Sequence, residues 1–348
     1  PMNLLISVIG GSTCTEDEER MAEAVGAELA AQEINEAGGY MGRPLELVTH
    51  DDKASPDEGR KIAEELVVQR KADFTIGYCN TGVALNALEV FQQHKHLLMV
   101  AVATGTQITA RYPAGESFVF HLSPRDSLQV AFLVQELVKK GWTRIAVFAD
   151  KTGYGEGGLK DVERLLAEKN LKPAYVARFD IGVASLTAQV AEAKAAGAEA
   201  IISYTVGPEQ AVMARSRAEA RFAGPLFGPW TLSFRSVGDK AGAAIEGASM
   251  PQTIIQDISH ERRSSFIARL RKHAGTQPVA SLMAAAEAYD AVHLMLRAVF
   301  QSHGDTSGPA LKHALENLDR PYAGVVTTYE RPFSATRSEE HTSELQSH

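Results

Sequence analysis

The sequence RIAVFADKTGYGEGGLKDVERLLAEK, residues 144–169, contains the pattern that decides the fold. Its apolar run at 144–150 predicts a strand, and the amphipathic spacing from about 157 to 169 predicts a helix. Between them lies a small polar turn, Thr152-Gly153-Tyr154, of a kind that we call an elbow. Because the strand is apolar throughout, we expect helices on both faces of its sheet.

This unit of strand, elbow and helix recurs about eight times between Leu4 and Trp230. The repeat predicts an α/β protein with parallel sheets, and such sheets bind ligands outside the carboxyl ends of their strands. We therefore look for function in the elbows, which hold Gly10-Gly11-Ser12-Thr13, Asn80-Thr81, Thr104-Gly105-Thr106, Thr152-Gly153-Tyr154, Tyr204-Thr205 and Trp230.

The number of units predicts two lobes, because the alternation restarts after 121–124 and breaks near 248–251. We assign 1–121 and 251–324 to lobe 1, and 122–250 with about 325–336 to lobe 2. Helices expected at 260–273, 279–301 and 309–318 return the chain to lobe 1, and 322–329 begins another crossing strand. Residues 337–348 resemble a translated sequencing adapter, so we expect an artefact tail outside the fold.

The composition excludes several functions. The formal net charge of -8, with no basic cluster, argues against nucleic-acid binding. No apolar run reaches the ~20 residues that span a bilayer. Pro1 leads almost directly into a strand, so we expect that any signal peptide was removed or lies outside this sequence.

Two cysteines, Cys14 and Cys79, follow predicted strands. If those strands are neighbours, the two sulfurs can approach each other, and a disulfide would suit an oxidising compartment. The alternative, which we favour, is that they are two small pocket-rim or buried residues.

The motifs of nucleotide binding and catalysis are absent from the sequence. The loop Gly10-Gly11-Ser12-Thr13 lacks the glycine spacing of a dinucleotide site, and no phosphate-binding loop or nucleophile elbow occurs. Asp51 and Asp52 are expected to shape and cap a loop, and His121 to be structural. We expect no cofactor, no metal and no enzymatic activity.

The elbows at Asn80-Thr81 and Thr104-Gly105-Thr106 suit an anion. Each follows a strand and precedes a helix, so hydroxyls, an amide and backbone N–H groups gather at one sheet edge. Ordinary N-capping of the helices is the alternative for each elbow taken singly.

The segments AAQEINEAGG (30–39), GRPL (42–45), Asp51-Asp52 and DKTGYGEG (150–157) resemble the branched-chain amino-acid-binding proteins. These are type I periplasmic solute-binding proteins of ABC importers. The resemblance runs in order from about Leu4 to Tyr329. It implies two Rossmann-like lobes joined by three crossings, with a small ligand trapped between them by hinge closure. It also implies a periplasmic monomer that serves membrane permease subunits of an ABC transporter.

The resemblance also implies a ligand site. A ligand carboxylate would be held at Asn80-Thr81 and at Ala103-Thr104, Tyr154 would cover the ligand, and the loop at Tyr204-Thr205 would line the other side. The family's acid that receives the α-ammonium is replaced by Trp230, whose indole N–H only donates. We expect four residues at the rim, namely Ser12, Glu19, Tyr78 and Cys79.

These departures favour a carboxylic acid without an amine, aromatic or aliphatic, over an amino acid. The alternative for Trp230 is a core residue at a strand end. The alternative for the protein is a cytoplasmic sensor of amide or amino-acid-type ligands on the same fold.

Overall fold

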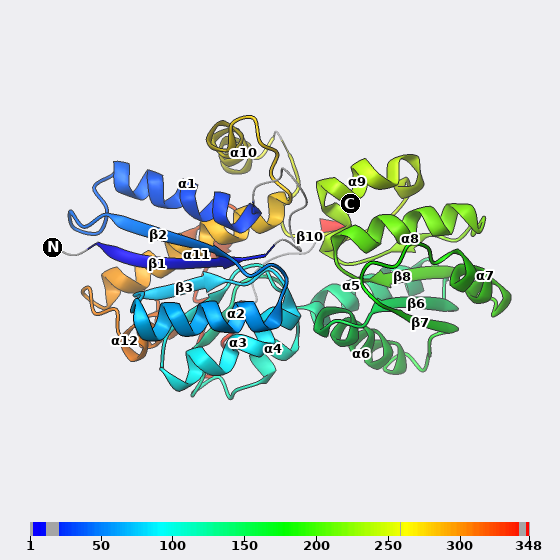
Figure 1. Cartoon of the computed structure of the whole chain (residues 1–348), viewed down its shortest axis with the longest axis horizontal. Coiled ribbons are helices and arrows are strands. Elements are labelled where there is room, and N and C mark those ends of the chain that lie inside the picture. Colours follow the sequence, from blue (N-terminus) through cyan, green and yellow to red (C-terminus); the bar gives the residue numbers. More distant parts are fainter. Residues whose placement is uncertain (1–2, 12–20, 258, 341–345, 348) are drawn as a thin grey trace. The chain divides into compact units, whose positions relative to one another are not determined.

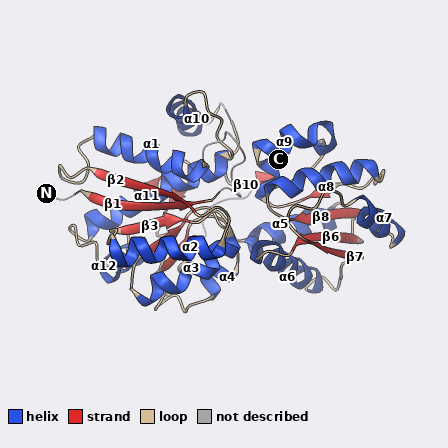
Figure 2. Ribbon diagram, in the orientation of Figure 1, coloured by secondary structure: helices blue, strands red, loops and turns tan. Residues whose placement is uncertain are grey.

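The computed structural model describes residues 3–11, 21–257, 259–340 and 346–347. The chain forms two compact units. Residues 1–124 and 253–344 make up lobe 1, and residues 125–252 and 345–348 make up lobe 2. Helices cover both faces of the sheet in each lobe (Figure 2).

Lobe 1 is built on a five-stranded parallel sheet in the order β2-β1-β3-β4-β5 (Figure 1). Its strands are β1 (Leu4–Gly10), β2 (Leu45–Asp51), β3 (Phe74–Gly77), β4 (Leu98–Val100) and β5 (Val119–His121). The strands that precede the two cysteines, β1 and β3, are therefore neighbours, as the cysteine argument required.

The helices of lobe 1 come from both ends of its sequence. On one face, the core joins the sheet to α2 (Pro56–Glu64), its π-helical extension η2 (Glu65–Gln69), α3 (Thr81–Gln93) and α4 (Gln107–Ala110). The remaining helices are α1 (Ala22–Glu36), α10 (Glu261–Ala274), α11 (Leu282–Gln301) and α12 (Gly308–Glu316). Helices α1 and α11 cross closely at Gly26, where an added Cβ would lie 2.0 Å from the Ala285 carbonyl oxygen.

Residues 322–336 differ from the prediction. The expected crossing strand is an antiparallel hairpin of β11 (Tyr322–Ala323) and β12 (Thr328–Tyr329), and 325–336 belong to lobe 1, not to lobe 2. The physical reason is Asp290 on α11, which is fully buried. Its carboxylate accepts hydrogen bonds from the backbone N–H groups of Val325 and Val326, at 2.8 and 2.9 Å, and from two tyrosine hydroxyls. A buried carboxylate needs such donors, and the turn supplies them.

The prediction that residues 337–348 form a tail outside the fold is wrong for residues 338–340, which run beside the edge strand β5. The N–H of His121 donates to the Ser338 carbonyl at 2.9 Å, and the N–H of Glu340 donates to the His121 carbonyl at 2.8 Å. This placement gives partners to backbone groups that an edge strand would otherwise leave open.

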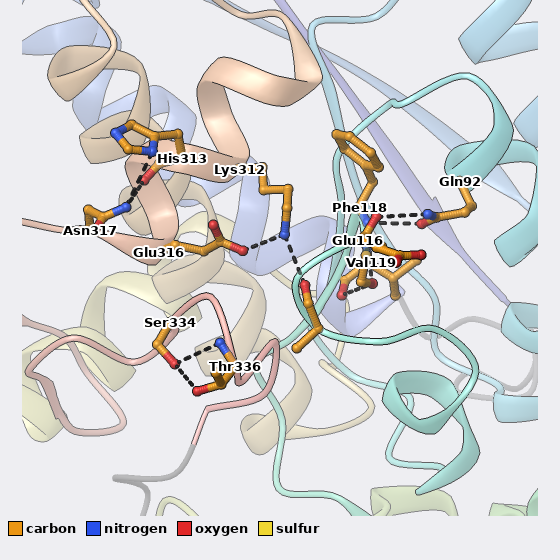
Figure 3. Close-up of polar contacts among 12 residues, drawn as sticks. Gln92, Glu116, Phe118, Val119, Lys312, His313, Glu316, Asn317, Ser334 and Thr336 are labelled. Atoms are coloured by element: carbon orange, nitrogen blue, oxygen red, sulfur yellow. Dashed lines mark hydrogen bonds and ion pairs between the residues drawn. The ribbon is translucent and has the colours of Figure 1, made fainter.

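Side chains also fix the segment that leads into β5 (Figure 3). The Gln92 amide donates to the Glu116 carbonyl and accepts from the Phe118 N–H, at 2.8 and 3.0 Å. On α12, Lys312 pairs with Glu316 and donates to the Ala114 carbonyl. The Lys312 Nζ also lies 5.6 Å from the centre of the Phe120 ring, so α12 packs beside β5.

Lobe 2 has a four-stranded parallel sheet in the order β7-β6-β8-β9. The strands are β6 (Ile145–Asp150), β7 (Tyr175–Phe179), β8 (Ala200–Tyr204) and β9 (Leu226–Phe227). Its helices are α5 (Asp126–Lys139), α6 (Gly153–Ala167), α7 (Thr187–Ala195), α8 (Gly207–Glu219) and α9 (Arg235–Ala241), with the 3-10 turns η3 (Trp230–Ser233) and η4 (Gly242–Ile245). A short antiparallel pair joins β10 (Pro251–Gln252) to β13 (Gln346–Ser347). The first four strands of both lobes share one order, which confirms the predicted α/β class with two parallel-sheet lobes.

Candidate functional site

In lobe 1, the elbows after β3 and β4 lie against each other. The Gly105 N–H donates to the Thr81 hydroxyl oxygen at 3.1 Å. A Cβ added at Gly105 would lie 2.2 Å from the Thr81 Cγ2, so only glycine permits this approach. The two elbows that the sequence proposed as a carboxylate site are thus brought together.

The Asn80 side chain works as a helix cap in this elbow. Its Oδ1 accepts from the N–H groups of Gly82 and Val83, at 2.8 and 3.2 Å. Those amides are therefore engaged by Asn80, and the capping alternative holds for this residue. The Thr81 hydroxyl keeps a hydrogen that it can donate, since its hydrogen bond to Gly105 uses only an oxygen lone pair.

The backbone of Ala103 is fixed on both sides. Its N–H donates to the Tyr78 carbonyl at 2.7 Å, and its carbonyl lies 2.7 Å from the His121 Nε2 and 3.0 Å from the Ser123 hydroxyl. A carbonyl only accepts, so the His121 Nε2 carries the proton. His121 and Ser123 thereby position the elbow that contains Thr104, a structural role of the kind expected for His121.

The rim residues have different outcomes. Tyr78 is fully buried and its hydroxyl donates to the Gly59 carbonyl at 3.1 Å, so it is a core residue and not part of a rim. Cys79 is disulfide-bonded. Cys14, the other cysteine of the sequence, lies outside the described residues, as do Ser12 and Glu19.

In lobe 2, Asp150 at the end of β6 ties two elbows together. One carboxylate oxygen accepts from the N–H and the hydroxyl of Thr152, at 2.8 and 2.5 Å. The other accepts from the Thr205 hydroxyl at 2.7 Å and from the Val206 N–H at 3.1 Å. Thr205 is thus engaged within its own lobe. Asp150 positions both elbows, a role that the sequence did not predict for it.

Two tyrosines, Tyr154 and Tyr204, lie close in sequence to the threonines that bond to Asp150. Tyr154 lies in the first turn of α6, and its ring contacts that of Tyr204 with centroids 5.2 Å apart. The Tyr204 hydroxyl donates to the Asp126 carboxylate at 2.7 Å, and its ring fills the space beside Gly158. Tyr204 therefore belongs to the core of lobe 2 and supports Tyr154, whereas the resemblance placed it along the ligand.

Trp230 begins the 3-10 turn η3 after β9. Its N–H donates to the Gln129 side chain at 3.1 Å, its carbonyl accepts from the Ser233 hydroxyl at 2.6 Å, and its ring meets Phe234 edge to face. The backbone at this position is therefore fixed independently of the side chain that it carries.

A sequence profile of the periplasmic binding protein family matches residues 19–341. The chain belongs to this family. It is 28% identical over 241 residues to a leucine-, isoleucine-, valine-, threonine- and alanine-binding protein of Pseudomonas aeruginosa. That match covers 68% of this chain and 63% of the relative. The chain thus spans less than two thirds of that relative's length.

Solved structures share the fold of this periplasmic binding protein. A substrate-binding protein of Streptococcus pneumoniae in complex with isoleucine has a TM-score of 0.83 at 20% identity, covering 97% of this chain and 94% of its own. A solute-binding protein of R. palustris in complex with 4-hydroxybenzoate has a TM-score of 0.84 at 15% identity, covering 100% and 92%. These identities support the fold and leave the ligand open.

The periplasmic binding protein also has a buried acid pair at the ends of β1 and β2 that the sequence reasoning missed. Glu23 and Asp52 are both fully buried. Burial, with a smaller contribution from Asp52, raises the pKa of Glu23 to about 8. Burial likewise raises the pKa of Asp52 to about 7, although its Oδ1 accepts from the Ala54 N–H.

The helical spacing of the sequence does indicate that Glu23 is buried. Glu23, Ala27 and Ala30 share one helical face, and both alanines are buried. Asp52 has the loop-shaping role that was expected of it, because its carboxylate accepts from the Ala54 N–H.

Among the described helices, none is both long and apolar enough to cross a bilayer.

Proposed function

We propose that this periplasmic binding protein is the extracytoplasmic solute receptor of an ABC importer, and that its ligand is a small carboxylate without an α-ammonium group. The protein binds its ligand and releases it to permease subunits without turnover. Family membership supports a receptor, and the chemistry of the elbows supports the ligand class.

In this proposal, Thr81 and Thr104 bind the carboxylate of the ligand. They stand on two elbows held together by the Thr81 to Gly105 hydrogen bond, at the carboxyl edge of a parallel sheet. Hydroxyl donors, together with the first turn of α3, stabilise a carboxylate without a cationic partner. Asn80 shapes this first turn, and Ala103 carries Thr104 on a backbone that His121 and Ser123 hold.

The presence of Trp230 is the main support for the proposed ligand class. It occupies the place where the family resemblance implies an acid, and its indole can donate a hydrogen bond but cannot accept one from an ammonium group. An aromatic ring there favours an apolar body on the ligand, and ring contacts add about 0.5–1.5 kcal/mol beyond burial. Tyr154, supported by Tyr204, contributes the second aromatic surface. The structure in complex with 4-hydroxybenzoate shows that this fold accommodates such a ligand in another protein.

The disulfide-bonded state of Cys79 supports a periplasmic location, because disulfides persist in oxidising compartments and are rare in the cytosol. It argues against the alternative of a cytoplasmic sensor of amides or amino acids. We further propose that the receptor acts as a monomer, that a ligand engages both lobes, and that hinge closure traps it.

A thermal-shift screen tests the proposal. Benzoate, 3-phenylpropanoate and 4-methylpentanoate should raise the melting temperature, because a ligand that binds only the folded state stabilises it. Thr104→Ala and Tyr154→Ala should reduce the shift. The matched controls Thr187→Ala and Tyr175→Phe alter exposed hydroxyls that bond to Glu219 and Glu192, and they should keep it. A full shift in both site variants would refute the site assignment.

A further inference from the structure

A pocket of about 600 Å³ lies on lobe 1 between the C-terminal half of α11 and the loop after α12. Residues spaced along one side of α11 form one wall, and residues 318–320 form the other. Its volume is in the range of small-molecule sites, about 300–1,000 Å³. The residues that matter to its chemistry are His293, Arg297, Phe300, Leu318, Asp319 and Arg320.

The pocket lies at the opposite edge of the sheet from the elbows. Phe300 contacts the Tyr40 ring edge to face, with centroids 4.7 Å apart. Tyr40 sits between the end of α1 and the start of β2, so this is the amino edge of the parallel sheet. Thr81 and Thr104 follow the carboxyl ends of β3 and β4. The pocket is therefore separate from the candidate site within the same lobe.

The pocket offers cationic groups that the described chain does not neutralise. Arg297 and Arg320 form no ion pair or hydrogen bond with any described residue, and Asp319 is the acid in the lining. The two arginines and the one aspartate of the lining give a net charge of 2 - 1 = +1. The Arg297 guanidinium lies 4.9 Å from the centre of the Tyr322 ring, which fixes its plane and leaves its N–H donors for another partner.

His293 lines the pocket beside these cations. Its ring is stacked on Tyr322, with centroids 5.5 Å apart, and also contacts Tyr289. Its Nε2 is buried and has no hydrogen-bond partner among the described residues. The His293 ring therefore forms part of the pocket wall, and it stacks on the same tyrosine that Arg297 contacts.

The walls of the pocket are held in place without a ligand. The Gln301 side chain donates to the Asn317 carbonyl at 2.7 Å and accepts from the Asp319 N–H at 3.1 Å. These bonds attach the loop after α12 to the end of α11. The pocket therefore does not need to be ordered by binding, which lowers the cost of association.

We propose that this pocket is a second binding site, specific for a small organic anion with an apolar body. Arg297 and Arg320 bind the anionic group, and Phe300 and Leu318 contact the apolar body. This inference does not depend on the ligand proposed for the elbows.

Isothermal titration calorimetry of the full chain with 2-naphthoate tests this inference. The titration uses the Thr104→Ala/Tyr154→Ala variant, so that binding at the elbows does not contribute. Saturable binding of one naphthoate is expected. The neutral analogue 2-naphthamide should bind at least about tenfold more weakly, because charge-assisted hydrogen bonds to guanidinium are lost.

Variants locate the binding to this pocket. Adding Arg320→Ala should weaken naphthoate binding by about tenfold or more. Adding Arg235→Ala, which removes an exposed arginine of lobe 2 that pairs with Asp239, should leave it unchanged. Arg320 makes no ring contact in the described chain, so its loss leaves the packing intact, whereas Arg297 also packs on Tyr322. Absent binding, equal binding of naphthoate and naphthamide, or unchanged affinity in the Arg320 variant would each overturn the proposal.

Discussion

The Thr205 hydroxyl donates a 2.7 Å hydrogen bond to the Asp150 carboxylate and so joins the ends of β8 and β6. The same carboxylate accepts from Thr152 and Val206. One buried acid therefore sets the first turn of α6, where Tyr154 sits, and the elbow after β8. Lobe 1 uses the Thr81 to Gly105 bond for the same purpose. In both lobes, strand ends are fixed to each other before any ligand is present.

We expect Asp150→Asn to destabilise lobe 2 by about 2–4 kcal/mol, because an amide nitrogen cannot accept and buried donors lose their partner. Urea denaturation followed by circular dichroism measures the loss. Asp180→Asn, at an exposed position paired with Lys151, is the matched control and should change stability by less than about 0.5 kcal/mol. Equal behaviour of the two variants would show that the Asp150 network is not stabilising.

We expect Gly105→Ala to lower stability by about 1–3 kcal/mol and to weaken ligand binding, because the new Cβ collides with Thr81. Thr81→Ser removes the Cγ2 that lies 2.2 Å from the added atom and keeps the hydroxyl. The double variant should therefore recover part of the loss. A double-mutant cycle of thermal unfolding measures this coupling. Strict additivity of the two changes would contradict the close approach of these elbows.

The buried pair Glu23 and Asp52 predicts a pH dependence of stability. The folded-state pKa of Glu23, about 8, lies above its ordinary value of 4.5, so the folded state retains a proton that the unfolded chain releases. The contribution of Glu23 to the free energy of unfolding should be fully present below pH 4.5 and should be lost as the pH rises toward 8. The slope is up to about 1.4 kcal/mol per pH unit for each such group. Asp52, with a pKa of about 7, acts in the same direction between 3.8 and 7.

Glu23→Gln tests this assignment, since the neutral amide resembles the protonated acid. Urea midpoints at pH 5, 6.5 and 8 should fall less steeply in this variant than in the natural sequence. Glu46→Gln, an exposed acid on β2 that bonds to Asn3, provides the control and should keep the full slope. Parallel slopes in all three proteins would assign the dependence to other groups.

Trp230→Ala should weaken binding of aromatic acids by about tenfold, given the area and ring contacts that an indole provides. Trp230→Phe should retain most of the affinity. The backbone bond from position 230 to Gln129 does not depend on the side chain, so the turn should survive both changes. Trp142→Ala, which removes the other tryptophan of lobe 2, serves as the control in calorimetric titrations with benzoate. Unchanged affinity after Trp230→Ala would favour the core reading of this residue.

The fold was largely predictable because periodicity reports burial directly. Continuous apolar runs became the strands of two parallel sheets, and the long helices after residue 260 follow their amphipathic spacing. β5 was missed because three residues, Val119–His121, are too few to show a period. Residues 322–329 were misread because alternating apolar residues suit a strand, whereas Gly324 allows a turn against Asp290, 32 residues or more away in sequence.

The site was predictable only in part, because tertiary partners decide what an elbow residue does. Both aromatic residues Tyr78 and Tyr204 follow or end apolar strands, and nothing in the local sequence reveals Gly59 or Asp126 as the acceptor of their hydroxyls. The proximity of Thr81 and Gly105 was inferable, since parallel strands place their elbows at one edge.

The most direct test of the proposed function compares ligands that differ only in the α-ammonium group. Calorimetric titrations should pair 4-methylpentanoate with leucine and 3-phenylpropanoate with phenylalanine, in the Arg320→Ala variant so that the pocket on α11 does not contribute. We predict that each acid binds at least about tenfold more tightly than its amino acid, because Trp230 cannot accept from the ammonium group. Tighter binding of leucine and phenylalanine would contradict the proposed ligand class.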